Sequence, residues 1–305
     1  MSILPASDPA SSPCPSTPAI ATILDARGRH IDGFPIRRLL PAIGRHLVGP
    51  FIFFDHMGPA VLAPGQGFDV RPHPHIGVAT VTYLFEGESV HRDSLGSYQR
   101  IQPGEINWMT AGRGIVHSER TSPELRQTGS QMNGLQLWVA LPLAHEETEP
   151  EFHHHPANTL PELDLAGVRL RVLAGTAYGQ TSPVRTCSPL FYVDAALPAG
   201  GALELPRDHE ERAAYVVAGS ITCGAERAEP GRMLVFTPGA AVELRASADA
   251  RVALIGGAPI DGERQIWWNF VSSSRDRIER AKHDWKAGRF PRVPGDEVEF
   301  VPLPE

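Results

Sequence analysis

A pattern that occurs twice along the chain constrains its fold more than any other feature. Residues 83–87, YLFEG, match residues 215–219, YVVAG, at an offset of 132 positions. A Pro-Gly pair followed by Thr and Gly over residues 103–112 recurs over residues 230–239, at an offset of 127. The Gly and Pro identities fall where turns are expected in both copies. Repetition over such a span is typical of one structural unit used twice, so we predict two copies of one β-unit.

Composition and strand signals give the class of this unit. The 29 glycines and 29 prolines among 305 residues favour many turns and short strands over long helices. Val78–Phe85 is rich in β-branched and aromatic residues and lies between Gly77 and Gly87, which predicts a strand. Similar apolar runs recur every 8 to 12 residues, roughly the spacing found in sandwiches and barrels. We therefore predict an all-β protein.

The length of the chain fits two domains, at about 150 residues each. We expect a disordered tail over residues 1–20, rich in Pro, Ser and Ala, and a first domain over residues 21–146. An acidic, histidine-rich stretch at 147–166 is interpreted as a linker. The second domain is expected over residues 167–305.

One helix is expected near the C-terminus, over about residues 274–287. Ser273 followed by Asp276 resembles a capping box, and Ile278, Ala281 and Trp285 then recur at helical spacing. These apolar residues predict a helix that packs one face on a barrel.

Charge, apolar runs and cysteines exclude several classes of protein. A net charge of −7 argues against a general phosphate-binding surface, so we expect no direct contact with nucleic acid. No apolar run approaches the roughly 18 residues of a membrane span, and the first residues lack the pattern of a signal peptide. Cys14, Cys187 and Cys223 are odd in number and widely spaced, which favours neither a disulfide framework nor a thiolate zinc site. A cytoplasmic protein with no membrane contact is expected.

Two short motifs predict a metal site. Pro72-His73-Pro74-His75 precedes the strand at 78–85, and the segment at 112–119, GRGIVHSE, contains His117 and Glu119. Side chains two positions apart on an extended strand share a face, so each pair projects together. If both segments are neighbouring strands with these pairs inward, three imidazoles and one carboxylate converge. Such a donor set suits Fe(II), Mn, Co, Ni, Cu or Zn.

The other histidines have less specific interpretations. His56 is expected near the mouth of a pocket, either in a structural hydrogen bond or beside substrate. His91 is interpreted as a loop residue after a hairpin, and His209 as a surface or loop residue. His153, His154 and His155 are expected in a solvated loop of the linker.

The motifs together resemble the pirin family, bicupin proteins of the cupin superfamily. The resemblance is dense over residues 20–145 and rests on GPFIFFDHMGP, HPHIGVATVTYLFEGE, HRDSLGS and PGEINWMTAGRGIVHSE. It continues more thinly through the second half to WWNFVSSSRDRIERAKHDW. It implies two tandem, jelly-roll-like cupin β-barrels followed by a C-terminal helix.

The resemblance also implies one bound metal, usually described as iron and most simply Fe(II), in the first barrel. Its ligands would be His73, His75, His117 and Glu119, the set that strand phase selects. One position departs from the family pattern: Ala79 stands where pirins usually carry a glutamate, which puts the polarity and shape of the pocket in doubt.

The repeat places no such ligands in the second copy. The two offsets put Leu205 and Arg207 opposite the first histidine pair, and Leu244 and Ala246 opposite the His-Glu pair. None of these is an ordinary metal ligand, so a barrel without a metal site is expected there.

For function, the resemblance implies O2-dependent ring cleavage of a flavonol such as quercetin, as in a quercetin 2,3-dioxygenase. The partners would be a small aromatic substrate and O2, with Glu119 acting as ligand and general base. The alternative is a non-enzymatic, redox-sensitive iron protein that regulates a transcription factor or a metabolic enzyme. The acidic net charge suits such a protein partner better than DNA. A monomer is expected, because the two barrels would bury each other's faces.

Overall fold

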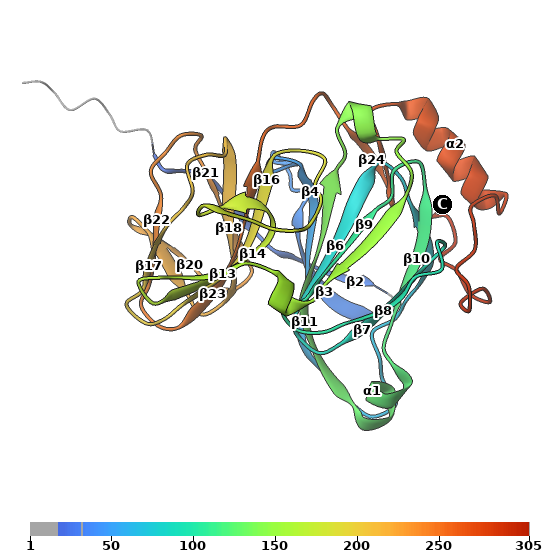
Figure 1. Ribbon diagram of the computed structural model, residues 1–305, viewed down its shortest axis with the longest axis horizontal. Coiled ribbons are helices and arrows are strands. Elements are labelled where there is room, and N and C mark those ends of the chain that lie inside the picture. The colour runs from blue at the N-terminus through green and yellow to red at the C-terminus, as the bar shows by residue number, and fades with distance from the viewer. Residues whose placement is uncertain (1–17, 32, 305) are drawn as a thin grey trace, which may run out of the picture.

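The computed structural model describes residues 18–31 and 33–304. Two units, each made of a large and a small antiparallel sheet, lie side by side (Figure 1). In the first unit a seven-stranded sheet has the order β12-β9-β6-β11-β4-β3-β2 and a four-stranded sheet has the order β5-β10-β7-β8. These strands are β2 Arg27–Ile31, β3 Phe34–Leu40, β4 Phe51–Leu62, β5 Val70–His75, β6 Val78–Glu86, β7 Ser89–Asp93, β8 Tyr98–Ile101, β9 Ile106–Thr110, β10 Ile115–Arg120, β11 Ser130–Ala140 and β12 Glu151–His155.

The second unit repeats this plan. Its large sheet has the order β1-β21-β18-β23-β16-β14-β13, with β15 paired to β14, and its small sheet has the order β17-β22-β19-β20. The run β21-β18-β23-β16 corresponds to β9-β6-β11-β4, which confirms the predicted duplication and the all-β class. The strands are β1 Ile20–Asp25, β13 Glu162–Leu165, β14 Val168–Ala177, β15 Gln180–Thr181, β16 Leu190–Leu197, β17 Ala202–Glu204, β18 Glu211–Ala218, β19 Ile221–Cys223, β20 Glu226–Ala228, β21 Arg232–Phe236, β22 Glu243–Ala246 and β23 Ala250–Gly257.

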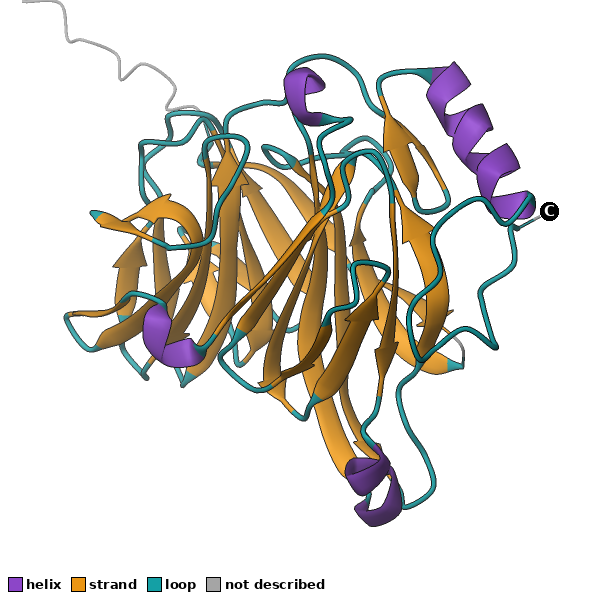
Figure 2. Cartoon of the chain, turned by 45° about the vertical axis from the view of Figure 1, so that its right-hand side comes forward, coloured by secondary structure: helices purple, strands orange, loops and turns teal. Residues whose placement is uncertain are grey.

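The remaining elements are short and lie around the strands (Figure 2). They are α1 Pro123–Thr128, η1 Leu143–His145, η2 Ala157–Thr159, the hairpin of β24 Gln265–Trp267 and β25 Phe270–Ser272, and α2 Arg275–Lys286. No helix in the described ranges has the length and apolarity to cross a membrane.

The largest apolar cluster joins the two large sheets. Alternate residues of β6, such as Val81 and Tyr83, pack together with Tyr192 and Tyr215 of the second unit. The other residues of β6 face the interior of their own unit, so eight of its nine residues are buried. A strand buried on both faces reads as a nearly continuous apolar run, which explains the sequence of β6.

The expected domain boundaries need correction, because a strand near the N-terminus belongs to the second unit and the C-terminal segment packs on the first. β1 lies in the range expected for the first domain, yet it pairs with β21 of the second. It begins at Ile20, inside the stretch expected to be a tail; residues 1–17 of that tail lie outside the described residues. The expected linker, 147–166, contributes β12 to the first large sheet and β13 to the second.

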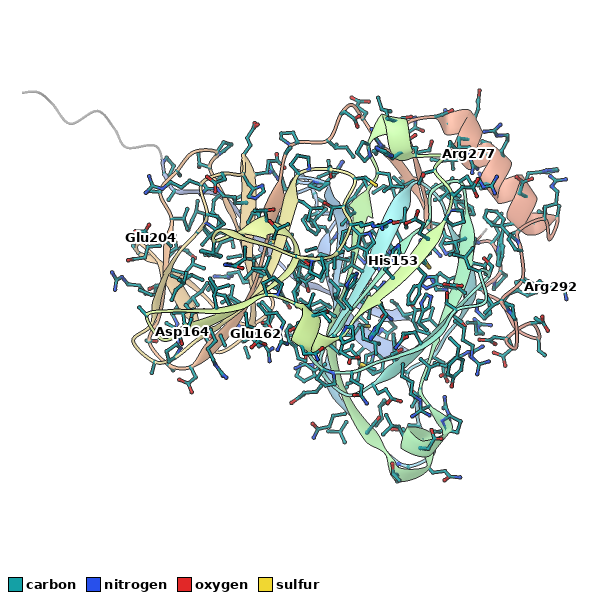
Figure 3. All side chains as sticks on the ribbon, in the orientation of Figure 1. His153, Glu162, Asp164, Glu204, Arg277 and Arg292 are labelled. Carbon is teal, nitrogen blue, oxygen red and sulfur yellow. The ribbon has the colours of Figure 1, made fainter. Side chains whose placement is uncertain are left out.

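The C-terminal segment returns to the first unit after β23. An isolated parallel bridge joins Ile76 to Phe270, and the amide of Val301 donates to the carbonyl of Pro72 at 2.8 Å. In the side-chain view, Arg292 of this segment lies beside the first unit, at the far end of the molecule from Glu204 (Figure 3). Residues expected in the second domain therefore complete the surface of the first.

Helix α2 confirms the expected helix, with one correction to its start. The N-cap is Ser274, whose Oγ accepts from the amide of Arg277; Ser273 instead donates through Oγ to Glu146. The apolar stripe is as expected, because Ile278 and Ala281 are buried against Phe270.

Candidate metal centre

Strand pairing brings the two predicted motifs together. β5 and β10 are antiparallel neighbours, and their register sets His117 opposite His73. The rings of His73 and His117 have centroids 4.3 Å apart, and each lies 5.0 Å from the ring of His75. The ligand atoms of the three histidines all lie within 4.8 Å of one another, and all three side chains are buried. This is the one such cluster of three or more His, Cys, Asp or Glu among the residues described.

Glu119 lies beside this cluster. The register of β10 on β5 shifts after His117, so Glu119 lies opposite Val70. Its Oε1 lies 3.4 Å from Nδ1 of His117, and the residue is 8% exposed. The three histidines form the compact group, with the carboxylate adjacent to one of them.

Burial controls the charge of these groups. It lowers the pKa of His117 well below its ordinary value, and neighbouring histidines lower it further. Burial likewise lowers the pKa of His75, with a contribution from His73. Burial raises the pKa of Glu119 to about 8, although the charge of Arg120 acts to lower it. The imidazoles of His75 and His117 are therefore held neutral, which is the form that binds a metal.

The donor atoms fit a metal ion. Both ring nitrogens of His117 and Oε2 of Glu119 are buried without a hydrogen-bond partner in the described part of the chain. Buried polar atoms are nearly always paired, and an ion among these four side chains would satisfy one ring nitrogen of His117 and the Glu119 oxygen. A set of nitrogen and oxygen donors without thiolate suits a divalent first-row metal.

A cavity of about 380 Å³ lies against the cluster. His73, His75 and Glu119 line it from the small sheet, and Phe53, Asp55 and Trp138 are among the residues that line it from the large sheet. Its volume falls in the range of about 300–1,000 Å³ found for small-molecule sites.

Part of the cavity wall was not foreseen. Trp268 and Asn269, in the turn between β24 and β25, line the cavity together with Val301. Trp268 has a φ of 53°, an uncommon conformation for a bulky residue, and strain of this kind clusters at functional sites. The sequence signal that could have indicated this contact is Gly77. Its φ is 70°, and a Cβ there would lie 2.0 Å from the carbonyl oxygen of Val271. Only glycine permits this approach.

His91 is a further residue that sequence reasoning misplaced. It lies in β7, is 5% exposed, and its ring centroid is 5.4 Å from that of His117. Its Nε2 lies 3.0 Å from Oδ2 of Asp93, and its ring stacks on Phe152 at 4.2 Å. The loop interpretation was wrong because His91 lies within β7, whose pairing with β10 sets it opposite Glu119.

The remaining histidines are resolved by their contacts. His56 is fully buried at the boundary between the units, where Nδ1 lies 2.6 Å from the hydroxyl of Tyr215, so its role is structural. His153, His154 and His155 lie in strand β12 rather than in a solvated loop. His209 lies in a loop, as expected.

Ala79 does not face the cavity. It belongs to the apolar cluster between the two units, whereas Thr82 and Leu84 of the same strand line the cavity. The departure from the family pattern therefore changes the boundary between the units and leaves the cavity wall unaltered.

The second unit has an apolar interior at the corresponding place. Leu244 lies opposite Leu203, as His117 lies opposite His73, so Leu203 takes the place that the offset assigned to Leu205. Arg207 is exposed and lies outside the strands. Leu203, Leu244 and Ala246 all belong to the core of this unit.

Two cupin-type β-units, of which the first alone carries a histidine cluster in its described residues, define a bicupin with one candidate metal centre. The model of the pirin family matches residues 33–139, and the model of the pirin C-terminal cupin domain matches residues 192–291. A pirin-like protein of Caulobacter vibrioides is 50% identical over 290 residues, covering 94% of this chain and 100% of that protein. The chain belongs to the pirin family.

Solved structures agree with this assignment. The crystal structure of quercetin 2,3-dioxygenase from Acinetobacter baumannii has a TM-score of 0.87 and 34% identity, covering 93% of this chain and 95% of that one. The bacterial pirin YhhW from Escherichia coli, in complex with nickel(II), has a TM-score of 0.63 at 20% identity, covering 78% and 99%. The latter likeness concerns the fold alone.

Proposed function

We propose that this chain is a metal-dependent dioxygenase that cleaves a ring of a flavonol such as quercetin with O2. The observation that carries the proposal is a set of buried donor atoms without partners, on His117 and Glu119, beside a cavity with aromatic walls. The name of the Acinetobacter baumannii relative supports the substrate class.

In this proposal His73, His75, His117 and Glu119 hold one divalent ion. The family resemblance favours Fe(II), and the donor set also suits Zn, Mn, Co, Ni or Cu. Since burial keeps His75 and His117 neutral, the imidazoles need not lose a proton to bind it.

A bound divalent metal would supply Lewis acidity that lowers the pKa of a chelating substrate hydroxyl. Glu119 would then receive the hydroxyl proton. Glu119 is the carboxylate beside the cluster, with Oε1 3.4 Å from Nδ1 of His117, which suits this role. The aromatic side chains Phe53 and Trp138 would present a flat apolar surface to the substrate rings and keep water away.

Oxygen uptake by anaerobically purified, iron-loaded protein tests the proposal. The protein is mixed with flavonols and with catechol-like compounds, and O2 consumption is compared for wild type, Glu119→Gln and Glu151→Gln. The last variant is a matched control, because Glu151 is an exposed carboxylate on β12.

We expect uptake with flavonols by wild type and by the control. Glu119→Gln keeps an oxygen donor but removes the base, so uptake falls by about a hundredfold or more. No uptake by fully loaded wild type with any of these compounds would refute the dioxygenase and favour the regulator.

A further inference from the structure

A line of polar side chains crosses the cavity wall that faces the candidate ligands. Gln136 of β11 lies opposite Thr82 of β6 on one side and opposite Asp55 of β4 on the other. Asp55 in turn lies opposite Arg38 of β3. All four residues line the cavity. We call these four residues the polar row.

An ion pair forms one end of the polar row. Arg38 donates through Nε and Nη2 to the two carboxylate oxygens of Asp55, each at 2.8 Å. Asp55 is fully buried, whereas the side chain of Arg38 is 28% exposed. The third nitrogen of this guanidinium, Nη1, donates to no residue that the structure describes, so a donor is left for a ligand.

The other end of the polar row is also only partly satisfied. The hydroxyl of Thr82 donates to Oε1 of Gln136 at 2.8 Å. This bond orients the Gln136 amide and leaves its NH₂ group without a described partner. The polar row therefore offers donors at Arg38 and Gln136, and the remaining lone pairs of Asp55 as acceptors.

An aromatic surface connects the candidate ligands to the polar row. The ring of Trp138 meets that of His75 edge-on at 4.9 Å and stacks on Phe53 at 4.0 Å. The guanidinium of Arg38 lies over Phe53 at 4.3 Å. Phe53 and Asp55 are alternate residues of β4, so the aromatic pair lies one pleat away from the polar row on the same face.

We propose that the polar row binds hydroxyl groups at the end of the substrate that does not reach the metal, so the preferred substrate is a planar aromatic with polar groups at both ends. This inference rests on the proposed function for the location of the metal-binding end. An Arg–Asp pair is neutral as a whole and offers both donors and acceptors, which suits a hydroxyl group. A carboxylate substituent would gain no net charge attraction there, because Asp55 already compensates the charge of Arg38.

The test is anaerobic binding of two flavonols to metal-loaded protein, measured by calorimetry. Quercetin carries the chelating group and further hydroxyls on both of its outer rings, whereas unsubstituted flavonol carries the chelating group alone. The variant is Arg38→Met combined with Asp55→Leu, because replacing both partners of a buried ion pair by apolar residues is often neutral for stability. Circular dichroism checks that the variant is folded.

The chain offers a matched control in Arg251 and Asp194. Arg251 also pairs bidentately with a nearly buried aspartate and stacks on an aromatic ring, Phe85, at 4.5 Å. Neither Arg251 nor Asp194 lines the cavity. Arg251→Met combined with Asp194→Leu therefore removes a comparable pair, together with the acceptor of the Tyr83 hydroxyl, without changing the polar row.

We expect wild type to bind quercetin more tightly than unsubstituted flavonol. The Arg38 and Asp55 variant should weaken quercetin binding by about tenfold or more, as the loss of hydrogen bonds to charged groups predicts, and change flavonol binding by less than about threefold. The control should change neither. Equal effects on the two ligands, no effect on quercetin, or no preference for quercetin in wild type would overturn the proposal. Because binding is measured without turnover, tight selective binding without O2 uptake would refute the dioxygenase alone.

Discussion

Replacing His117 by alanine tests the candidate metal centre at a fully buried ligand. Without metal, two effects of this change oppose each other. The lost ring leaves a cavity, which destabilises by about 2–4 kcal/mol, as for other large-to-small core changes. The same change removes buried nitrogens that lack a hydrogen-bond partner, which stabilises the folded state by about 1–3 kcal/mol. We therefore expect metal-free wild type and variant to differ by only about 1 kcal/mol in free energy of unfolding.

With metal present the two proteins should separate. An ion at about 100 times its Kd stabilises the folded state by about 2.7 kcal/mol. For a chain of 305 residues, at about 2.1 cal/mol/K of unfolding entropy per residue, that corresponds to a rise of about 4 °C in Tm. His117→Ala removes one of three clustered imidazoles and should lose most of this rise.

The measurement is calorimetric melting of chelator-treated protein with and without added Fe(II), Mn, Co, Ni or Zn, the iron samples being kept anaerobic, together with elemental analysis. His153→Ala serves as the control, because His153 lies on β12 outside the cluster. Equal metal content in wild type and His117→Ala, or an equal rise in Tm, would refute the assignment of this histidine.

Three further predictions concern the boundary between the units. Burial lowers the pKa of His56 to about 4, against an unfolded-state value of about 6.5. Its contribution to stability is therefore present above about pH 6.5 and is lost as the pH falls toward 4. In urea denaturation over that range, the free energy of unfolding of wild type should fall by about 3 kcal/mol more than that of His56→Phe. A similar loss in both proteins would contradict this role. Ala79→Glu should destabilise by about 3 kcal/mol or more by burying a carboxylate in an apolar cluster, yet leave metal content unchanged; a lower metal content would place this side chain at the cavity after all. Tyr83→Phe should cost about 1–2 kcal/mol in denaturant unfolding, because its hydroxyl donates to Asp194 at 2.6 Å, and an unchanged stability would mean that this bond contributes nothing.

Several features of the fold and the site could be predicted from local sequence. The phase of His73 with His75, and of His117 with Glu119, follows from the alternation of side chains along an extended strand, which any β-strand imposes. The duplication was visible because turns that need Gly or Pro recur at matched positions. The same alignment placed mostly apolar residues of the second unit at the positions of the histidine cluster, although strand register replaces Leu205 by Leu203.

Other features depend on contacts between segments far apart in the chain. The face of β6 that carries Ala79 packs on the second unit, and only that contact shows that position 79 lies away from the cavity. Trp268 and Asn269 reach the cavity because the last segment crosses back to the first unit. The polar row likewise exists only through the registers of four neighbouring strands.

Local sequence is enough to show which residues can act as ligands, since strand periodicity and donor chemistry are local properties. The tertiary structure decided which strands become neighbours, in which register, and which segments close the cavity. Those choices follow from the burial of apolar surface between distant segments, a free energy that belongs to the folded chain as a whole and is not encoded in any single motif.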